Sequence, residues 1–329
     1  MSHMAGLLRP GFPVPEAVES AWTWMERQGF GSTTQHGYFL TPYAGQRRLG
    51  VVFTPDASLD GWFPEDAAGL DRLLPIAQVG GDGSVGALWL DDDGSTRVVG
   101  LGSEGEAFLL ADSAVEFLTL VAIGYGELSP YVLGLPPDDA DSVRAVGGFR
   151  TWVRDTFSVA VPDEWPAVGS DAFTTWVRTV LGEPEPPRPD EIVVDGPSAP
   201  VTGEITALVR ALGCPDGGPE VGAVAAAAGV ELSDGGVRWS GGVLRKVGLE
   251  VILDRGVVST IFARVHEYPG RLVDGLPAAP SRTEITAALG EPERGGDSWV
   301  RYLVEGRYLH FQLDDSDRVT MITAMVEAP

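Results

Sequence analysis

The stretch VGALWLDDDGSTRVVGL, at residues 85–101, decides the fold expected for the N-terminal half of this 329-residue chain. Val85–Leu90 and Thr96–Leu101 are short, mostly apolar runs, and Asp91-Asp92-Asp93-Gly94 lies between them. Aspartate and glycine favour tight turns, so the pattern predicts a β-hairpin whose turn carries three carboxylates.

Further strand and turn signals lie on both sides of this hairpin. Pro75–Gln78 predicts a preceding strand, and Gly80-Gly81-Asp82-Gly83 predicts the turn that joins it to the hairpin. Downstream, Phe108–Leu110 predicts a third strand, and Ser113-Ala114-Val115-Glu116 is a capping box that opens a helix. The glycines of 100–105 have dinucleotide-site spacing, but a strand follows them instead of a helix, which argues against such a site.

Helices are expected to flank these strands. Pro15–Gln28 has a proline suited to the first helical turn, and a glycine follows it at the position typical of a helix end. The motif Phe-x-x-Trp-Val-Arg occurs twice, at 149–154 and at 173–178, and places its apolar residues on one helical face. We therefore expect two amphipathic helices that cover a sheet. Two further strands are predicted near Tyr38–Leu40 and Leu49–Phe53.

The charge of the chain is strongly negative and unevenly distributed. The formal net charge is −24, and residues 1–196 carry 29 acidic residues against 11 arginines. Residues 82–141 contain 12 acidic residues and a single basic one, Arg97. Such a field repels nucleic acid and anionic membranes and attracts a basic partner; the plainer alternative is that it serves solubility alone.

Proline density marks a domain boundary between residues 182 and 200. Extended, semi-rigid chain is expected here, which gives domains at 1–181 and 201–329. Residues 1–4 resemble an expression-vector scar and are set aside from the fold. The prolines of the boundary segment are Pro184, Pro186, Pro187, Pro189, Pro197 and Pro200.

The C-terminal domain contains an internal repeat, at about 218–265 and 280–326. Each copy combines a helical segment, a tryptophan and a strand–turn–strand, which together are too small to bury a core alone. We therefore expect the two copies to pair into one α+β domain. The elements are Glu220–Ala228, Trp239, Leu249–Asp254 and Val257–Val265 in the first copy, and Arg282–Leu289, Trp299, Leu309–Asp314 and Arg318–Val326 in the second.

The sequence offers no recognisable catalytic, cofactor or metal site. His36, His266 and His310 have no metal-binding spacing, and alternation places His310 on the face of its strand opposite the core. The acidic turns lack the calcium-loop pattern. Cys214 is the only cysteine, which excludes an intramolecular disulfide and fits a reducing compartment. We see no signal peptide and no run of the ~20 apolar residues that a membrane span needs, so a cytoplasmic protein is expected.

Residues 73–128 resemble the SUKH superfamily, whose pattern is a proline-led strand, a glycine-rich turn, a hairpin and a helix. The resemblance implies an α+β domain, extending to about residue 181, with a mixed sheet flanked by helices. Bacterial members are similar to immunity proteins that bind and neutralise polymorphic or contact-dependent toxins, and fungal members are interaction hubs. The matching segments are Leu74-Pro75-Ile76-Ala77, Gly80-Gly81-Asp82-Gly83-Ser84, Ala87-Leu88-Trp89-Leu90-Asp91, Val98-Val99-Gly100-Leu101-Gly102-Ser103, 110–118 and Ile123-Gly124-Tyr125.

The second C-terminal copy resembles the BamE-like fold. The resemblance rests on Ser281–Ile285, Leu289-Gly290-Glu291-Pro292, Trp299 and Arg318-Val319, and the tandem arrangement is similar to β-lactamase inhibitor proteins. Both groups are binding scaffolds, so this resemblance also implies binding.

We therefore expect a non-catalytic binding protein, foremost an immunity protein against a basic toxin, present as a monomer or weak homodimer. The alternatives are a regulatory or scaffold protein with an endogenous protein partner, and an enzyme whose site the sequence does not reveal. Neither nucleic acid nor a membrane is an expected partner. The candidate partner-binding residues are the acidic loop residues and one exposed aromatic: Asp82, Asp91, Asp92, Asp93, Glu104, Glu106 and Trp62.

Overall fold

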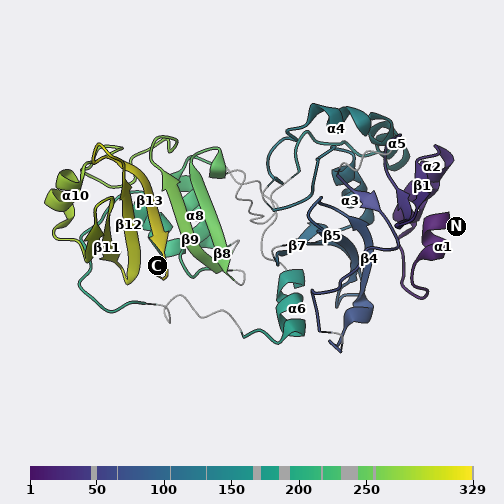
Figure 1. Ribbon diagram of the computed structural model, residues 1–329, viewed down its shortest axis with the longest axis horizontal. Coiled ribbons are helices and arrows are strands. Elements are labelled where there is room, and N and C mark those ends of the chain that lie inside the picture. Colours follow the sequence, from purple (N-terminus) through teal and green to yellow (C-terminus); the bar gives the residue numbers. More distant parts are fainter. Residues whose placement is uncertain are drawn as a thin grey trace. The chain divides into compact units, whose positions relative to one another are not determined.

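The computed structural model divides the chain into two compact units, Met1–Pro184 and Glu185–Pro329 (Figure 1). Both units are α+β: each contains helices and one antiparallel sheet. The structure describes residues 1–45, 50–64, 66–103, 105–130, 132–165, 172–184, 193–215, 218–230, 244–254 and 257–327.

The N-terminal sheet has seven strands that are hydrogen-bonded in the order in which they occur along the chain. A mixed sheet was expected, but every neighbouring pair is antiparallel. For β4 to β7 the reason is that short turns join the strands, whereas a parallel pair needs a crossover of roughly a dozen residues. The strands are β1 (Gly31–Thr34), β2 (Gly37–Leu40), β3 (Val52–Phe53), β4 (Leu73–Gln78), β5 (Val85–Leu90), β6 (Thr96–Leu101) and β7 (Ala107–Ala111).

The hairpin predicted at residues 85–101 forms as β5 and β6. Asp91 N donates to Ser95 O at 2.9 Å, and Gly94 N donates to Asp91 O at 3.0 Å. Gly94 has a φ of 83°, a left-handed conformation that glycine adopts without steric cost. The turn chemistry of the sequence therefore fixes the hairpin locally.

Helices cover one face of this sheet. The helices α2 and α3 are the predicted ones, and α3 is capped by Ser113, whose side chain accepts a hydrogen bond from Glu116 N. Their apolar side chains join those of Leu88, Val98 and Phe108 in one core. The helices of the unit before α6 are α1 (His3–Leu7), α2 (Glu16–Arg27), α3 (Ala114–Val121), α4 (Ala140–Ala145) and α5 (Gly147–Phe157), and a short 3-10 helix spans Leu70–Arg72.

The opposite face of the sheet is covered by α6 (Ala172–Leu181). Phe173 and Val177 of α6 are buried against Trp89 and Leu101 of the strands. The two Phe-x-x-Trp-Val-Arg helices, α5 and α6, are thus both amphipathic as predicted, but they belong to different cores.

Residues 1–4, which were set aside from the fold, take part in it. Met4 is fully buried in the core, and Ser2 caps α1 by accepting a hydrogen bond from Ala5 N. Glu26 of α2 accepts hydrogen bonds from the backbone of His3 at 3.0 Å and of Met4 at 2.9 Å. Burial of the Met4 side chain and the hydrogen bonds from the first N–H groups of α1 to Glu26 therefore anchor this end of the chain.

The C-terminal unit has a six-stranded sheet in the order β10-β11-β12-β13-β9-β8. Its core lies between α7, α8 and α10 and one face of the sheet, and α8 lies behind the strands in Figure 1. The strands are β8 (Leu249–Asp254), β9 (Val257–Arg264), β10 (Arg294–Gly296), β11 (Trp299–Val304), β12 (Arg307–Leu313) and β13 (Val319–Met325), and the helices are α7 (Ile205–Ala211), α8 (Pro219–Ala227) and α10 (Arg282–Leu289).

The two sequence copies join through their last strands, β9 and β13. Ile261 pairs with Ala324 and Ala263 pairs with Ile322, around a central pair of Phe262 and Thr323. The register therefore has local two-fold symmetry, because each Ile-x-Ala segment faces the reversed Ala-x-Ile of the other copy. Trp239, the tryptophan expected in the first copy, lies outside the described residues.

The proline-rich segment is not a spacer along its whole length. Val194 N donates to Gly306 O at 2.9 Å, and Ala199 N donates to Leu303 O at 2.7 Å. Residues 193–200 thus belong to the C-terminal unit, because main-chain hydrogen bonds attach them to the end of β11 and its following turn.

Candidate functional site

The structure separates the predicted contact residues into two groups at opposite ends of the N-terminal sheet. Asp82 and Glu106 lie in the turns at one end of β5, and Asp91, Asp92 and Asp93 lie in the turn at its other end. β5 is 6 residues long, which at about 3.4 Å per residue separates the two groups by roughly 20 Å. Glu104 lies outside the described residues.

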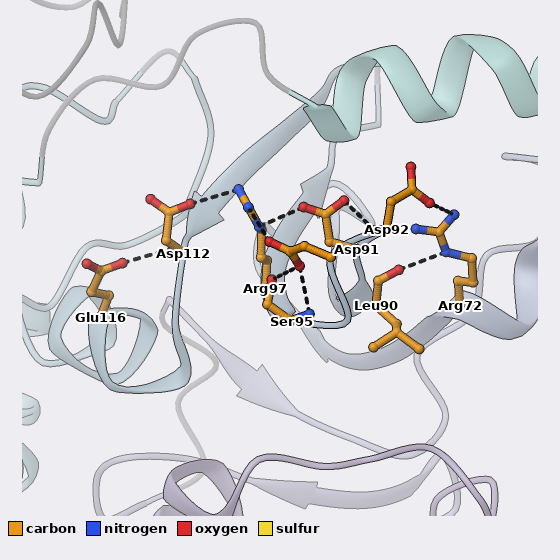
Figure 2. A network of polar contacts seen from close by, with 9 residues as sticks. Arg72, Leu90, Asp91, Asp92, Ser95, Arg97, Asp112 and Glu116 are labelled. Atoms are coloured by element: carbon orange, nitrogen blue, oxygen red, sulfur yellow. Dashed lines mark hydrogen bonds and ion pairs between the residues drawn. The ribbon is translucent and has the colours of Figure 1, made fainter.

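Arg97 organises the turn at 91–95 (Figure 2). Its guanidinium reaches three carboxylates: Nε is 3.0 Å from Asp91 Oδ2, Nη1 is 3.1 Å from Asp112 Oδ1, and Nη2 is 3.4 Å from Asp93 Oδ2. The Asp91 side chain is 10% exposed and that of Arg97 25% exposed, so this pair is partly shielded from solvent. Asp91 directly follows the first strand of the hairpin, and the second strand carries Arg97, which neutralises it.

Arg72, the last residue of the 3-10 helix before β4, holds the remaining carboxylate of the turn. Its Nη1 is 2.8 Å from Asp92 Oδ1, and its Nε donates to Leu90 O at 2.8 Å. The guanidinium lies 5.8 Å from the ring centre of Trp89 and 5.7 Å from that of Trp176. Asp92 itself is 88% exposed, so its carboxylate is fixed in position and open to solvent.

The turn also orders Asp93 and the beginning of α3. Asp93 Oδ1 accepts hydrogen bonds from Ser95 N at 2.7 Å and from Ser95 Oγ at 2.5 Å. These bonds, and next to them Arg97, lower the pKa of the Asp93 carboxyl below its ordinary value. Glu116 accepts a hydrogen bond from Asp112 N at 2.9 Å. We call these seven residues the acidic turn cluster: Arg72, Asp91, Asp92, Asp93, Arg97, Asp112 and Glu116.

The acidic turn cluster carries a surplus of negative charge in a fixed geometry. It contains five carboxylates and two guanidiniums, so its formal charge is −3. Charge-assisted hydrogen bonds fix the carboxylate directions before any partner arrives, which lowers the entropic cost of binding. Chemically, this arrangement can receive lysine or arginine side chains.

The other end of the sheet is held by Asp82. Its carboxylate accepts hydrogen bonds from Ser103 Oγ at 2.6 Å and from Ser84 N at 2.9 Å, which ties the β4–β5 turn to the β6–β7 turn. These hydrogen bonds, with Ser103 the largest contributor, lower the pKa of Asp82 to about 2. Glu106 is partly buried and lies over Gly102, whose missing side chain leaves room for its carboxylate.

Trp62, expected to be exposed, is only partly so. It packs with Phe63 against the core that α6 covers, with the two ring centres 6.2 Å apart. Its N–H donates to Leu59 O at 3.0 Å, which places the residue in a compact turn. These hydrophobic contacts account for a tryptophan at position 62 without any role in binding a partner.

A cleft of about 400 Å³ lies between residues 125–127 and 132–138 of the N-terminal unit. Its rim carries the exposed carboxyl groups of Glu127 and Asp138. Tyr125 OH donates to Leu135 O at 2.6 Å and accepts from Trp165 N at 2.8 Å, and burial raises the pKa of this phenol. Among the described residues lining the cleft, no histidine, cysteine or lysine accompanies these carboxylates.

The histidines that could have supported an enzyme do not form a site in the described part of the chain. His36 and His266 are both exposed, and His36 Nε2 lies 3.0 Å from Gln35 Nε2. Within the described ranges, no group of three or more His, Cys, Asp or Glu side chains is placed to hold a metal ion. No helix in those ranges is long and apolar enough to cross a membrane.

Sequence reasoning identified the carboxylates of the hairpin turn but missed the residues that organise them. Arg97 was noted only as the single basic residue of its region, although the hairpin register already places it near the turn. Arg72 ends the 3-10 helix that precedes β4, and Asp112 directly follows β7, so only the assembled sheet brings them to the turn. Comparison with protein-family models, curated proteins and solved structures finds no match for this chain.

Proposed function

We propose that the N-terminal unit is a binding module for a basic protein, and that the chain is an immunity-type protein that neutralises a basic toxin in the cytoplasm. The observation that carries the proposal is the acidic turn cluster, which presents ordered carboxylates on the surface of a strongly acidic unit. The resemblance of residues 73–128 to SUKH immunity proteins supports the same interpretation.

The exposed members of the acidic turn cluster are the contacts that a basic partner would meet. The Asp92 and Asp93 side chains are 88% and 58% exposed, whereas that of Asp91 is 10% exposed. Asp91 therefore serves the turn, and Asp92 and Asp93 serve the partner. Guanidinium and ammonium groups gain most from carboxylates that are already oriented, because little ordering remains to be done on binding.

Long-range attraction adds to these contacts. Residues 1–196 carry 18 more negative than positive charges. A field of this size speeds the encounter with a positively charged protein, and dissolved salt weakens it. A toxin that cleaves nucleic acid is basic at the surface that contacts phosphate, so blocking that surface with carboxylates would neutralise it.

The experiment measures binding of the full chain to the toxin domain encoded beside its gene, by surface plasmon resonance at two salt concentrations. The double variant Asp92→Lys, Asp93→Lys is expected to weaken binding about 10- to 100-fold, mainly through slower association. Co-expression of the unaltered chain is expected to restore growth to cells that produce the toxin, and the double variant to restore it poorly.

The matched control is Asp155→Lys with Asp163→Lys, which reverses two exposed charges of the same unit outside the acidic turn cluster. This control is expected to lose no more than about threefold in affinity, because only the general field changes. Equal losses in the two double variants would refute the assignment of the site. Absence of binding by the unaltered chain would refute the proposed function itself.

A further inference from the structure

The sheet of the C-terminal unit has a face that the helical core does not use. The strand residues of that core lie on the other face by alternation, except Val258 and Val319, which reach it because a register shift of the pairing lies beside each. We call the side away from the core the open face, and its middle is shielded, since Arg301, Leu303, Thr323 and Met325 are each at most 7% exposed. The register lines up its residues in three rows across the strands: Arg294, Arg301, His310, Thr323, Phe262 and Glu250; Gly296, Trp299, Gln312, Met321 and Arg264; and Leu303, Tyr308, Met325, Thr260 and Ile252.

The composition of the open face is unusual for a solvated sheet surface. The outer face of an antiparallel sheet is normally polar, whereas these rows are rich in aromatic, methionine and arginine side chains. Within the three rows Glu250 is the one carboxylate, in a chain with 47 acidic residues. Arg245 and Arg264 bind it at 2.7 and 2.9 Å. Enrichment in aromatic residues, methionine and arginine, with depletion of acidic residues, is typical of protein interfaces.

Arg301 forms the centre of an ordered platform on this face. Its side chain is 6% exposed, and its Nε lies 2.9 Å from Glu293 Oε2. The guanidinium is 5.8 Å from the ring centre of Trp299 and 4.9 Å from that of Tyr308. Trp299 in turn stacks on His310, with ring centres 5.1 Å apart. An aromatic side chain has only two χ angles, and the Arg301 guanidinium is held between two rings. These side chains therefore lose little conformational entropy when a partner binds.

This platform carries more positive than negative charge. Arg294 lies directly opposite Arg301 in the β10–β11 pair, so both arginines are on the same face. Like charges directly opposite each other destabilise a strand pair. Glu293 compensates one of the two guanidiniums, while the exposed Arg294 adds a second. An anion placed above the pair would relieve this repulsion.

We propose that the open face docks an acidic segment of a protein, which places a carboxylate on the exposed Arg294, beside Arg301, and an apolar side chain on Trp299 and Met321. The inference goes beyond the proposed function, because it concerns the other unit and a partner of opposite charge. A nucleic-acid strand also combines negative charge with stacking bases. The C-terminal half disfavours it, because the 18 acidic and 12 basic residues of 197–329 give a net negative charge that repels a polyanion at every phosphate, whereas a single carboxylate is attracted by its nearest neighbours.

The test uses a random 12-residue peptide library displayed on phage, panned against the full-length chain. Recovered peptides are expected to combine Asp or Glu with Trp, Phe or Leu. A synthetic copy of the most frequent peptide then gives dissociation constants by fluorescence polarisation. Arg294→Glu is expected to weaken binding of this peptide at least about tenfold, since an attraction becomes a repulsion. Trp299→Ala is expected to weaken it by a similar factor, because the apolar half of the site is lost.

The matched control is Arg271→Glu, which makes the same charge change at an exposed position outside the strands of this unit. It is expected to change the affinity less than twofold. Peptides without acidic residues, or equal losses for Arg294→Glu and Arg271→Glu, would overturn the proposal. An oligothymidylate of 20 nucleotides is the second probe. Its binding at 0.15 M salt, with loss in Arg294→Glu, would replace the protein segment by nucleic acid and also overturn the proposal.

Discussion

The two sheets of this protein carry their polar clusters in different places. In the N-terminal unit both faces of the sheet are covered, one by α2 and α3 and the other by α6, and the polar cluster lies at the strand ends. In the C-terminal unit one face lies outside the helical core, and a polar and aromatic platform extends across its strands. The covering of a sheet therefore decides where ordered charges can lie, because a face buried by helices excludes them.

The largest expected effect comes from replacing one tryptophan on each sheet, Trp89 and Trp299, and comparing the losses of stability. Trp89 is 1% exposed beneath α6, with the ring centre of Phe173 at 5.2 Å, whereas Trp299 lies partly exposed on the open face. We expect Trp89→Ala to cost about 3 to 5 kcal/mol, because it leaves a cavity in a packed core. Trp299→Ala should cost about 1 kcal/mol or less, since solvent and neighbouring side chains can fill the space.

The measurement is unfolding of the full chain in urea, with hydrogen exchange followed on peptides from each unit. The Trp89 variant should destabilise peptides of the N-terminal unit, and the Trp299 variant should leave them unchanged. Equal losses for the two alanine variants would mean that the open face is packed as tightly as the covered one.

The parts of the fold that depend on local chemistry follow from the sequence. The hairpin at 85–101 follows from its turn residues, and α3 follows from Ser113 and Glu116, which interact over one helical turn. The duplication also follows, because both copies repeat the same order of helix and hairpin. The expectation of a mixed sheet was wrong: the short turns between β4 and β7 allow only antiparallel neighbours, and the strands before β4 also pair antiparallel.

The candidate sites depend on contacts between residues far apart in the sequence. In consecutive hairpins, successive turns lie at opposite ends of the strands. The turn at 91–95 must therefore lie at the end of the strands opposite the turns that precede and follow it. The sequence could therefore have shown that Asp82 and Asp91 belong to different ends. It could not show that Arg72 reaches Asp92, since that contact needs the β4–β5 register. The open face was missed for the same reason: alternation placed His310 outward, but only the sheet order brings Arg294 and Arg301 beside it.

Arg97 provides the second test, because it sharpens the contrast between an ordered cluster and ordinary surface ion pairs. Arg97→Ala leaves Asp91, Asp93 and Asp112 without their shared cation. We expect a loss of about 1 to 2 kcal/mol, reduced from the value for a fully buried pair because Arg97 is 25% exposed.

Arg154→Ala is the matched control for Arg97, since Arg154 and Asp155 form an ion pair with side chains 59% and 62% exposed. It should cost less than about 0.5 kcal/mol in the same urea experiment. A similar small loss in both variants would show that the acidic turn cluster adds no more than a surface pair.

Asp82 tests the other end of the N-terminal sheet. Its pKa of about 2 lies below the ordinary value of 3.8, so its contribution to stability is complete above that ordinary value and is lost as the pH falls towards 2. Asp82→Asn should cost about 1 kcal/mol or less at pH 7, because the site is exposed and only hydrogen-bond strength is lost. Its stability should also vary less than that of the unaltered chain between pH 4 and 2, which chemical denaturation at each pH measures. If the free energy of unfolding of Asp82→Asn fell between pH 4 and 2 as steeply as that of the unaltered chain, the role assigned to the hydrogen bonds from Ser84 and Ser103 would be contradicted.

The smallest expected effect is the pH dependence of stability that arises from His310, which lies on the open face. Burial, and after it the charge of Arg301, lowers the pKa of His310 below its ordinary value. The unfolded chain therefore takes up this proton at about pH 6.5, whereas the folded chain takes it up only at lower pH. The stability of the folded state should fall as the pH drops below about 6.5, and His310→Gln should remove that part of the slope.

Melting temperatures of the two proteins between pH 7.5 and 5.5 measure the effect, with His266→Gln as a control at an exposed histidine. Parallel pH profiles for the unaltered chain and His310→Gln would contradict the lowered pKa of His310. A diverging pair of profiles would mean that, at pH 7, the positive charge of the open face comes from its arginines alone. In that case an acidic segment bound there should bind more tightly as the pH falls, because protonated His310 adds a third positive charge to the row of Arg294 and Arg301.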